Sequence, residues 1–114
     1  SLMKEIVAGP VNSIIKQVSA PTADALKNLA FDLQENQENL FVLLAAEIEG
    51  KASLAISISK EVVASKGLDA GKIIRELAKE VQGGGGGQPF LATAGGQSPA
   101  GISKLLSLAP SYIA

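Results

Sequence analysis

The feature that most constrains this chain is the apolar run Leu40 to Ile48 (LFVLLAAEI), interrupted only by Glu47. A strand with one solvated face alternates apolar and polar residues, whereas a strand covered on both faces is apolar almost throughout. The run therefore predicts a central strand that is buried on both faces. The turn Glu49-Gly50-Lys51 and the alternation from Ala52 to Ile58 predict that a second strand folds back on it as a β-hairpin.

The segments around this hairpin have the patterns of helices and of further strands. Val11 to Val18 is rich in β-branched residues, and two longer segments with apolar residues at helical spacing begin at the N-cap candidates Thr22 and Asp69. The expected elements are a strand over 11–18, a helix over 22–36, the two hairpin strands, a short helix over 60–65 capped by Ser59, a helix over 70–82 and a short last strand over 90–94. A last helix, with Ser98 as N-cap and Pro99 as its first residue, extends to about Ala109. In the order β-α-β-β-α-α-(β)-α, these elements predict an α/β fold, a small mixed β-sheet of three to four strands with helices packed against it.

The length of 114 residues fits a single domain. Because the chain begins Ser-Leu-Met, we interpret residues 1–10 as a cloning remnant with a linker, and residues 11–114 as one domain of a larger protein. No apolar run approaches the roughly 18 residues that a membrane-spanning helix needs. We therefore expect a soluble cytoplasmic protein with no membrane partner.

The composition excludes several kinds of active site. Without cysteine or histidine, the chain has no disulfide, no thiolate or imidazole metal ligand, and no imidazole base. Its carboxylates form no Asp-x-Asp pair, and its serines have no histidine to activate them. We expect neither an active site nor a metal or cofactor in this chain. Phe31 and Phe41 are expected in the core, and with Phe90 they are too widely spaced in the sequence for a base-stacking platform.

The glycine run Gly83 to Gly87, followed by Gln88-Pro89, admits two interpretations. It is either a flexible linker or a loop whose backbone N–H groups approach an anionic ligand. The run lies inside the domain, directly after a helix, and a further pair of glycines follows at Gly95-Gly96. It does not match the phosphate-binding motifs of nucleotide enzymes, because Gly-Lys-Ser/Thr is missing and the run follows a helix instead of a strand.

The helix before the glycines has three cations on one face, Lys72, Arg75 and Lys79, and Lys104 in the last helix is a fourth candidate. With a net charge of −1, the chain has no global basic field, so such a local patch would have to attract a polyanion. The alternative is an ordinary solvated face, on which Glu76 and Glu80 form ion pairs with these cations along the helix.

The segment from Gly83 to Gly96 (GGGGGQPFLATAGG) resembles the signature near the C-terminus of alanyl-tRNA synthetases. Ala23-Asp24-Ala25-Leu26-Lys27, Ser59-Lys60 and Glu80-Val81 are similar to that family as well, so the resemblance covers about residues 11–114. It implies a domain type shared with the DHH phosphoesterases, in which the glycine motif contacts nucleic acid. It further implies a non-catalytic tRNA-binding domain of a larger ligase, with tRNA(Ala) as the partner and a capacity to dimerise. The ATP, magnesium and zinc sites would lie elsewhere in the parent protein.

Two residues depart from the family pattern. Gln88 stands where the family has arginine, and Phe90 stands where it has aspartate, so the glycine segment has one cation fewer for RNA. The candidate RNA-binding residues are Gly83, Gly84, Gly85, Gly86, Gly87, Gln88, Gly95, Gly96, Lys72, Arg75, Lys79 and Lys104. Two other functions stay open: an accessory domain of a DHH-type phosphoesterase, and a structural dimerisation module.

Overall fold

The apolar run forms the strand β2 (Leu40–Ile48) and lies inside a five-stranded sheet, as shown by a computed structural model that describes residues 5–114. The strand order is β1-β2-β3-β5-β4, with β1 parallel to β2 and the other neighbours antiparallel. The bounds of the other strands are β1 (Asn12–Gln17), β3 (Lys51–Ile58), β4 (Gly83–Gln88) and β5 (Leu91–Gly96). The predicted mixed α/β sheet and its hairpin are confirmed, with one strand more than expected.

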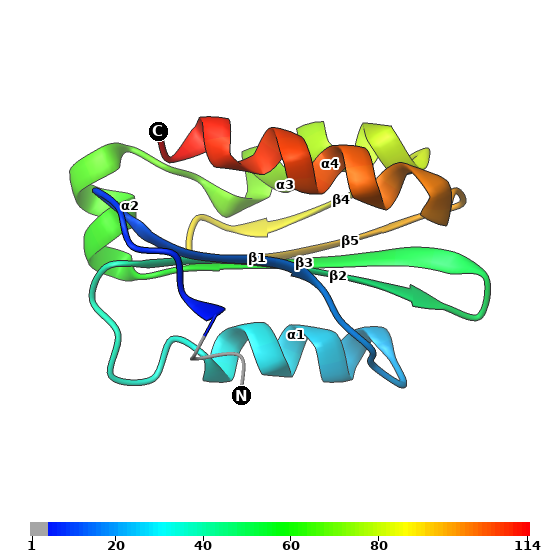
Figure 1. Ribbon diagram of the computed structural model, residues 1–114, viewed down its shortest axis with the longest axis horizontal. Helices are drawn as coiled ribbons and strands as arrows, with labels where there is room; N and C mark the ends of the chain where they lie inside the picture. The colour runs from blue at the N-terminus through cyan, green and yellow to red at the C-terminus, as the bar shows by residue number, and fades with distance from the viewer. Residues whose placement is uncertain (1–4) are drawn as a thin grey trace.

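Helices cover the two faces of the sheet unequally. In Figure 1, α3 and α4 lie above the sheet and α1 lies alone below it. The helices are α1 (Ala23–Asp32), α2 (Lys60–Lys66), α3 (Ala70–Ala78) and α4 (Ile102–Leu108), with 3-10 turns η2 (Lys79–Val81), η3 (Pro99–Gly101) and η4 (Ala109–Tyr112). Residues 40–46 of β2 are fully buried because apolar clusters lie on both faces, which confirms the prediction for a central strand.

Two of the four predicted helix caps are observed. The Thr22 hydroxyl accepts a hydrogen bond from the Ala25 amide at 3.1 Å, and the Asp69 carboxylate accepts one from the Gly71 amide at 2.9 Å. Ser59 and Ser98 do not cap their helices. The Ser59 hydroxyl instead accepts from the Leu40 amide at 3.0 Å and donates to Gln34, because Ser59 is buried where β3 ends.

Phe31 was expected in the core, but 56% of its surface is exposed. On α1, Leu26 and Ala30 occupy the buried face, and Phe31 lies on the side that the sheet does not reach. The helix also ends at Asp32 instead of continuing to residue 36, and Asn36 adopts a positive φ of 63° in the following turn. Phe41 is fully buried, as predicted.

The glycine run was expected to be a linker or a loop, and this was wrong: it forms β4, an edge strand paired residue by residue with β5. Glycine has no apolar or polar side chain, so a strand of five glycines has none of the alternation by which strands are recognised. The short strand predicted over 90–94 extends as β5 to Gly96 and so includes Gly95 and Gly96. The helix predicted over 70–82 ends at Ala78 and tightens into η2 before the strand begins.

Alternate glycines of β4 are required by the close approach of β5. A Cβ at Gly85 would lie 2.5 Å from the Cα of Ala94, and a Cβ at Gly83 would lie 2.5 Å from the Cα of Gly96. At Gly87, which has a φ of +153°, a Cβ would lie 2.6 Å from the Leu91 carbonyl oxygen. Real Cβ atoms do not come so near to backbone atoms, so these three positions admit only glycine without a shift of the strand.

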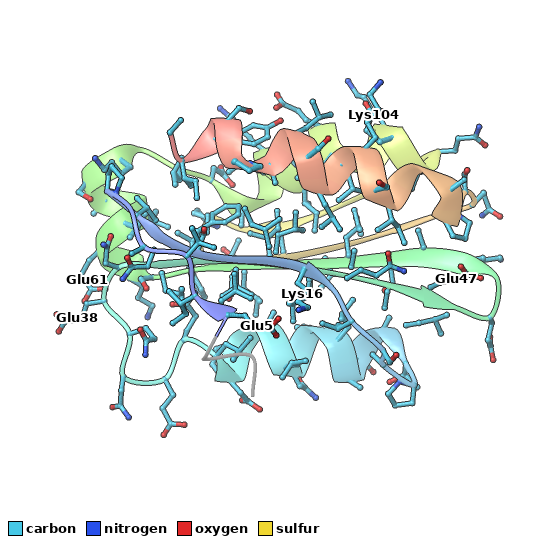
Figure 2. All side chains as sticks on the ribbon, viewed as in Figure 1. Glu5, Lys16, Glu38, Glu47, Glu61 and Lys104 are labelled. Atoms are coloured by element: carbon cyan, nitrogen blue, oxygen red, sulfur yellow. The ribbon has the colours of Figure 1, made fainter. Side chains whose placement is uncertain are left out.

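The prediction for residues 1–10 extends over Ser1 to Lys4, which lie outside the described residues, so it stays a prediction. Within the described part, Val7 and Ser13 form an isolated β-bridge, with N···O distances of 2.8 and 2.9 Å. The Lys16 ammonium of β1 contacts the Glu5 carboxylate. Figure 2 shows these two side chains turned toward one another between β1 and α1.

The C-terminal turn is joined to α3 by the only tyrosine of the chain. The Tyr112 hydroxyl donates a hydrogen bond of 2.5 Å to the Glu76 carboxylate. Burial first, and then the hydrogen bond and negative charge of Glu76, raise the pKa of Tyr112 from 10.0 to about 12. A phenol with a raised pKa in the folded state stabilises the fold below pH 10, and this contribution is lost as the pH rises from 10 through about 12.

We therefore expect the phenolate absorbance of Tyr112 to titrate with a midpoint near 12, and Glu76→Gln to lower that midpoint part of the way toward 10.0. The decrease should be incomplete because burial of the ring remains. An ultraviolet pH titration measures this directly, since the chain has one tyrosine and no tryptophan. A midpoint near 10 in the unsubstituted chain would contradict the contact.

Gly85→Ala should lower the free energy of unfolding by about 1–3 kcal/mol, because the added methyl group forces β4 away from β5. The matched variant Gly84→Ala should change it by no more than about 1 kcal/mol, because a Cβ there meets no atom within 4 Å. Urea unfolding followed by circular dichroism compares the two. Equal losses would show that the two positions are not sterically different.

Candidate nucleic-acid interface

The outer edge of β4 presents unpaired backbone groups. β4 is the last strand of the sheet, and an antiparallel ladder uses the N–H and C=O groups of alternate residues, so the others point away from β5. Within residues 5–114, no hydrogen bond outside the ladder reaches residues 83–88. Proteins usually protect such edges with charged side chains, proline or bulges. Here the edge is bare backbone until Gln88.

Two of the five glycines are not required by packing. A Cβ at Gly84 would meet open space, and a Cβ at Gly86 would meet only the end of the flexible Arg75 side chain, at 3.1 Å from Nη1. Each glycine in regular structure costs about 0.5–1 kcal/mol relative to alanine. The fold would therefore gain from side chains at these two positions, and their absence keeps the backbone of β4 open to a ligand.

α3 packs on β4 and brings the candidate cations near this edge. Arg75 reaches Gly86, and Lys72 is exposed about one turn before it on α3. Lys79 is exposed about one turn after Arg75, as the first residue of η2. The acids that could neutralise them have other partners: Glu76 accepts from Tyr112, and Glu80 lies 3.5 Å from the Lys104 ammonium. In the described chain, no carboxylate lies within 4.0 Å of these three cations. The structure therefore does not have the alternative arrangement, in which Glu76 and Glu80 form ion pairs with these cations.

Lys104 lies on α4, and Figure 2 shows it at the top of the molecule. Its pairing with Glu80 compensates its charge locally, and α4 packs on η2, η3 and β1 with no comparable contact to β4. The structure thus brings Lys72, Arg75 and Lys79 to the glycine edge but does not bring Lys104 there.

The two glycines of β5 differ from one another. Gly96 is buried, and a Cβ there would lie 2.5 Å from the Val81 Cγ2 atom, so this glycine is required by packing. Gly95 is exposed and lines a hollow of about 540 Å³ between α1 and the strands β4 and β5. Gln88 is exposed where β4 ends, and it lines an adjacent hollow of about 200 Å³.

Lys27 of α1 is a cation that the candidate set did not include. It lines both of these hollows, on the face of the sheet opposite to Arg75. Because α1 packs on β3 and β2 and reaches β5 but not β4, the flank with Lys27 borders the open part of the sheet at β5 and β4. The spacing Asp24, Lys27, Phe31 places three side chains on one flank of a helix, but only the tertiary arrangement shows that the glycine hairpin lies beside them.

The described residues contain no cluster of three or more Asp, Glu, His or Cys side chains able to hold a metal ion. Over the same residues, no helix is both long and apolar enough to cross a bilayer.

Comparison with known proteins identifies the domain type. The model of the DHHA1 domain family matches residues 11–114. The alanine–tRNA ligase of Cytophaga hutchinsonii is 46% identical over 99 residues, which are 87% of this chain and 11% of that protein. The ligase of Christiangramia forsetii is 52% identical over 103 residues, which are 90% of this chain and 12% of that protein. The chain thus spans about a tenth of the length of these relatives.

Solved structures agree with the fold. The C-Ala domain of alanyl-tRNA synthetase from Aquifex aeolicus superposes with a TM-score of 0.82 at 28% identity, covering 91% of this chain and 92% of that one. A DHH-domain protein described as a member of the S1P family of ribosomal proteins has a TM-score of 0.51 at 13% identity, covering 93% of this chain and 28% of that one, and shows a likeness of fold alone. The chain belongs to the DHHA1 domain family, in the form found in alanine–tRNA ligases.

Proposed function

We propose that the chain is the tRNA-binding, non-catalytic domain of a larger alanine–tRNA ligase, and that it holds tRNA(Ala) through the glycine edge of β4. Holding the tRNA would support aminoacylation and editing by the parent protein. The main support is Gly84, a glycine that the fold does not require. It lies in an unpaired strand edge, close to cations that form no ion pair in the described residues.

The chemistry of this edge suits a phosphate backbone. Outward N–H groups donate to phosphate oxygens, and the missing side chains let an RNA strand approach the backbone closely. Arg75 can add a bidentate, charge-assisted contact, with Lys72 and Lys79 as point charges on either side. Such contacts read shape and backbone more than base sequence, so the specificity for alanine would lie in the rest of the ligase.

The catalytic chemistry would lie outside this chain. The chain has no cysteine or histidine, the usual zinc ligands, so a zinc site of the parent ligase would use other residues. We expect its ATP and magnesium sites elsewhere in the parent protein as well. The parent protein would act in the cytoplasm. The DHH-type phosphoesterase alternative has support only from a likeness of fold, whereas the relatives with high identity are ligases.

A homodimer is a second candidate arrangement, because a bare strand edge can pair with the same edge of another copy. The solution mass of the chain with and without tRNA separates the two: an RNA-binding domain gains the mass of tRNA, whereas a dimerisation module doubles in mass without it.

The affinity for tRNA should be modest and should fall steeply as salt rises. Arg75→Ala combined with Lys79→Ala should weaken it and lower the slope of log affinity against log salt by about one to two. The matched control removes two cations elsewhere, Lys16→Ala with Lys66→Ala, and should leave the slope nearly unchanged. Fluorescence anisotropy of labelled tRNA at several salt concentrations measures both, and identical slopes for the two double variants would refute the assignment of the patch.

Gly84→Leu tests the backbone edge separately from the charges. The position has open space and no positive φ, so the variant should fold with nearly unchanged stability while its side chain stands on the edge. We expect tRNA affinity to fall about tenfold, a loss of about 1.4 kcal/mol, and Gly84→Ala to have a smaller effect. If Gly84→Leu binds tRNA as tightly as the unsubstituted chain, the ligand does not lie on β4.

A further inference from the structure

Three adjoining hollows lie in a row along the exposed flank of α1 and are together called here the α1 trough. The first hollow, at Asp24 and Gly95, and the second, at Gln88, have Lys27 and Thr93 in common as lining residues. The second and the third hollow both have Phe90 in their lining. From Asp24 to Phe31 the helix rises by about 10 Å, close to three steps of a nucleic-acid strand at about 3.4 Å each. The trough therefore has the length of a short segment of single strand.

The third hollow, of about 300 Å³, has phenyl rings from two distant parts of the sequence, Phe31 of α1 and Phe90 of the turn after β4. They were considered too widely spaced for stacking, but the fold places both at the same end of the sheet. Phe31 is 56% exposed and Phe90 is partly exposed, so neither ring is needed to fill the core. A volume of about 300 Å³ is at the lower end of pockets that take small ligands.

Hydrogen bonds hold the wall of this hollow in place. The Gln34 amide nitrogen donates to the Leu40 carbonyl at 3.0 Å and to the Ser57 hydroxyl at 3.1 Å, and its oxygen accepts from Ser59 at 2.7 Å. Ser57 in turn donates to the Ala30 carbonyl at 2.6 Å, which links the wall to α1 next to Phe31. Because the wall is formed before any ligand arrives, binding would cost little ordering of these groups.

The rim of the hollow is polar and charged. The Lys60 ammonium lies 5.2 Å from the centroid of the Phe90 ring, and Gln37 and Glu61 complete the lining. In the described residues, neither of these last two side chains takes part in a hydrogen bond or ion pair of the fold. Figure 2 shows Glu61 at the end of the molecule where the loop after α1 meets α2. An apolar slot with donors and acceptors at its rim suits a flat polar ring better than an aliphatic side chain.

We propose that the hollow between Phe31 and Phe90 binds an unpaired nucleobase of an RNA strand whose phosphates pass Lys27 in the α1 trough. This rests on the proposed RNA-binding function and adds a second contact on the opposite face of the sheet from Arg75. Stacking on exposed aromatic rings, with hydrogen bonds to the base edge, is how proteins bind unpaired bases. Asp24 at one end of the trough and Glu61 at the other both repel phosphate, so the phosphates are placed between them, at Lys27.

Removal of one ring should weaken RNA binding without unfolding the chain. Phe31→Ala should lower the affinity for a short single-stranded oligoribonucleotide, and for tRNA, about 10- to 100-fold, the effect of one lost stacking contact. Phe31→Tyr should retain binding because its ring still stacks. Leu108→Ala is the matched control, since Leu108 is an exposed apolar residue on α4, across the sheet from α1. Equal binding by Phe31→Ala and the unsubstituted chain would overturn the site.

Phe31→Trp gives a direct readout of stacking, because the chain has no tryptophan of its own. Its emission should be quenched by the oligoribonucleotide but not by inorganic polyphosphate, which supplies charge without bases. If anisotropy shows that the RNA binds while the emission stays unchanged, the nucleobase site is refuted and the glycine-edge function survives. If neither tRNA nor the oligoribonucleotide binds to the unsubstituted chain, the proposed function fails and this site fails with it.

Discussion

The unequal coverage of the two sheet faces is the constraint on which the rest of the molecule depends. β2 is apolar along both faces and must be covered from both sides, so the fold needs a helix layer above and below. The lower layer is α1 alone, a helix of ten residues, about 15 Å long. It packs on β3 and β2 and reaches only the near side of β5, so it leaves the α1 side of β4 open. The hollows beside Lys27 and Phe31 are a consequence of this shortfall.

Much of the fold could be predicted because its signals are local. The apolar run of β2, the hairpin turn at Gly50, and the caps Thr22 and Asp69 each depend on neighbours in the sequence. β4 could not be predicted as a strand, since glycine has no pattern of its own and the pairing with β5 decides its conformation. Phe31 was misassigned for the related reason that its burial depends on where the sheet ends, which is a tertiary property. Three candidate cations before the glycine run could be named from the sequence, but only the structure shows that Tyr112 and Lys104 occupy the nearby acids.

The glycine run combines two requirements that the sequence cannot separate. Gly83, Gly85 and Gly87 are imposed by the close approach of β5, and any chain with this hairpin would need them. Gly84 and Gly86 are under no such steric constraint, and the proposed RNA contact with the backbone would explain why side chains are absent there. A short glycine motif can thus be partly structural and partly functional, and the direction of each missing Cβ decides which part is which.

The same cations that would attract RNA also bear on self-association. A bare, side-chain-free edge strand is a template for pairing with another copy. Pairing two β4 edges would bring two sets of Lys72, Arg75 and Lys79 together, and like charges in close juxtaposition oppose association. A polyanion on the edge would satisfy the free N–H groups and neutralise the cations at once. In the free domain the cations therefore work against a dimer that pairs two β4 edges, and a bound polyanion competes with such a dimer for the same edge.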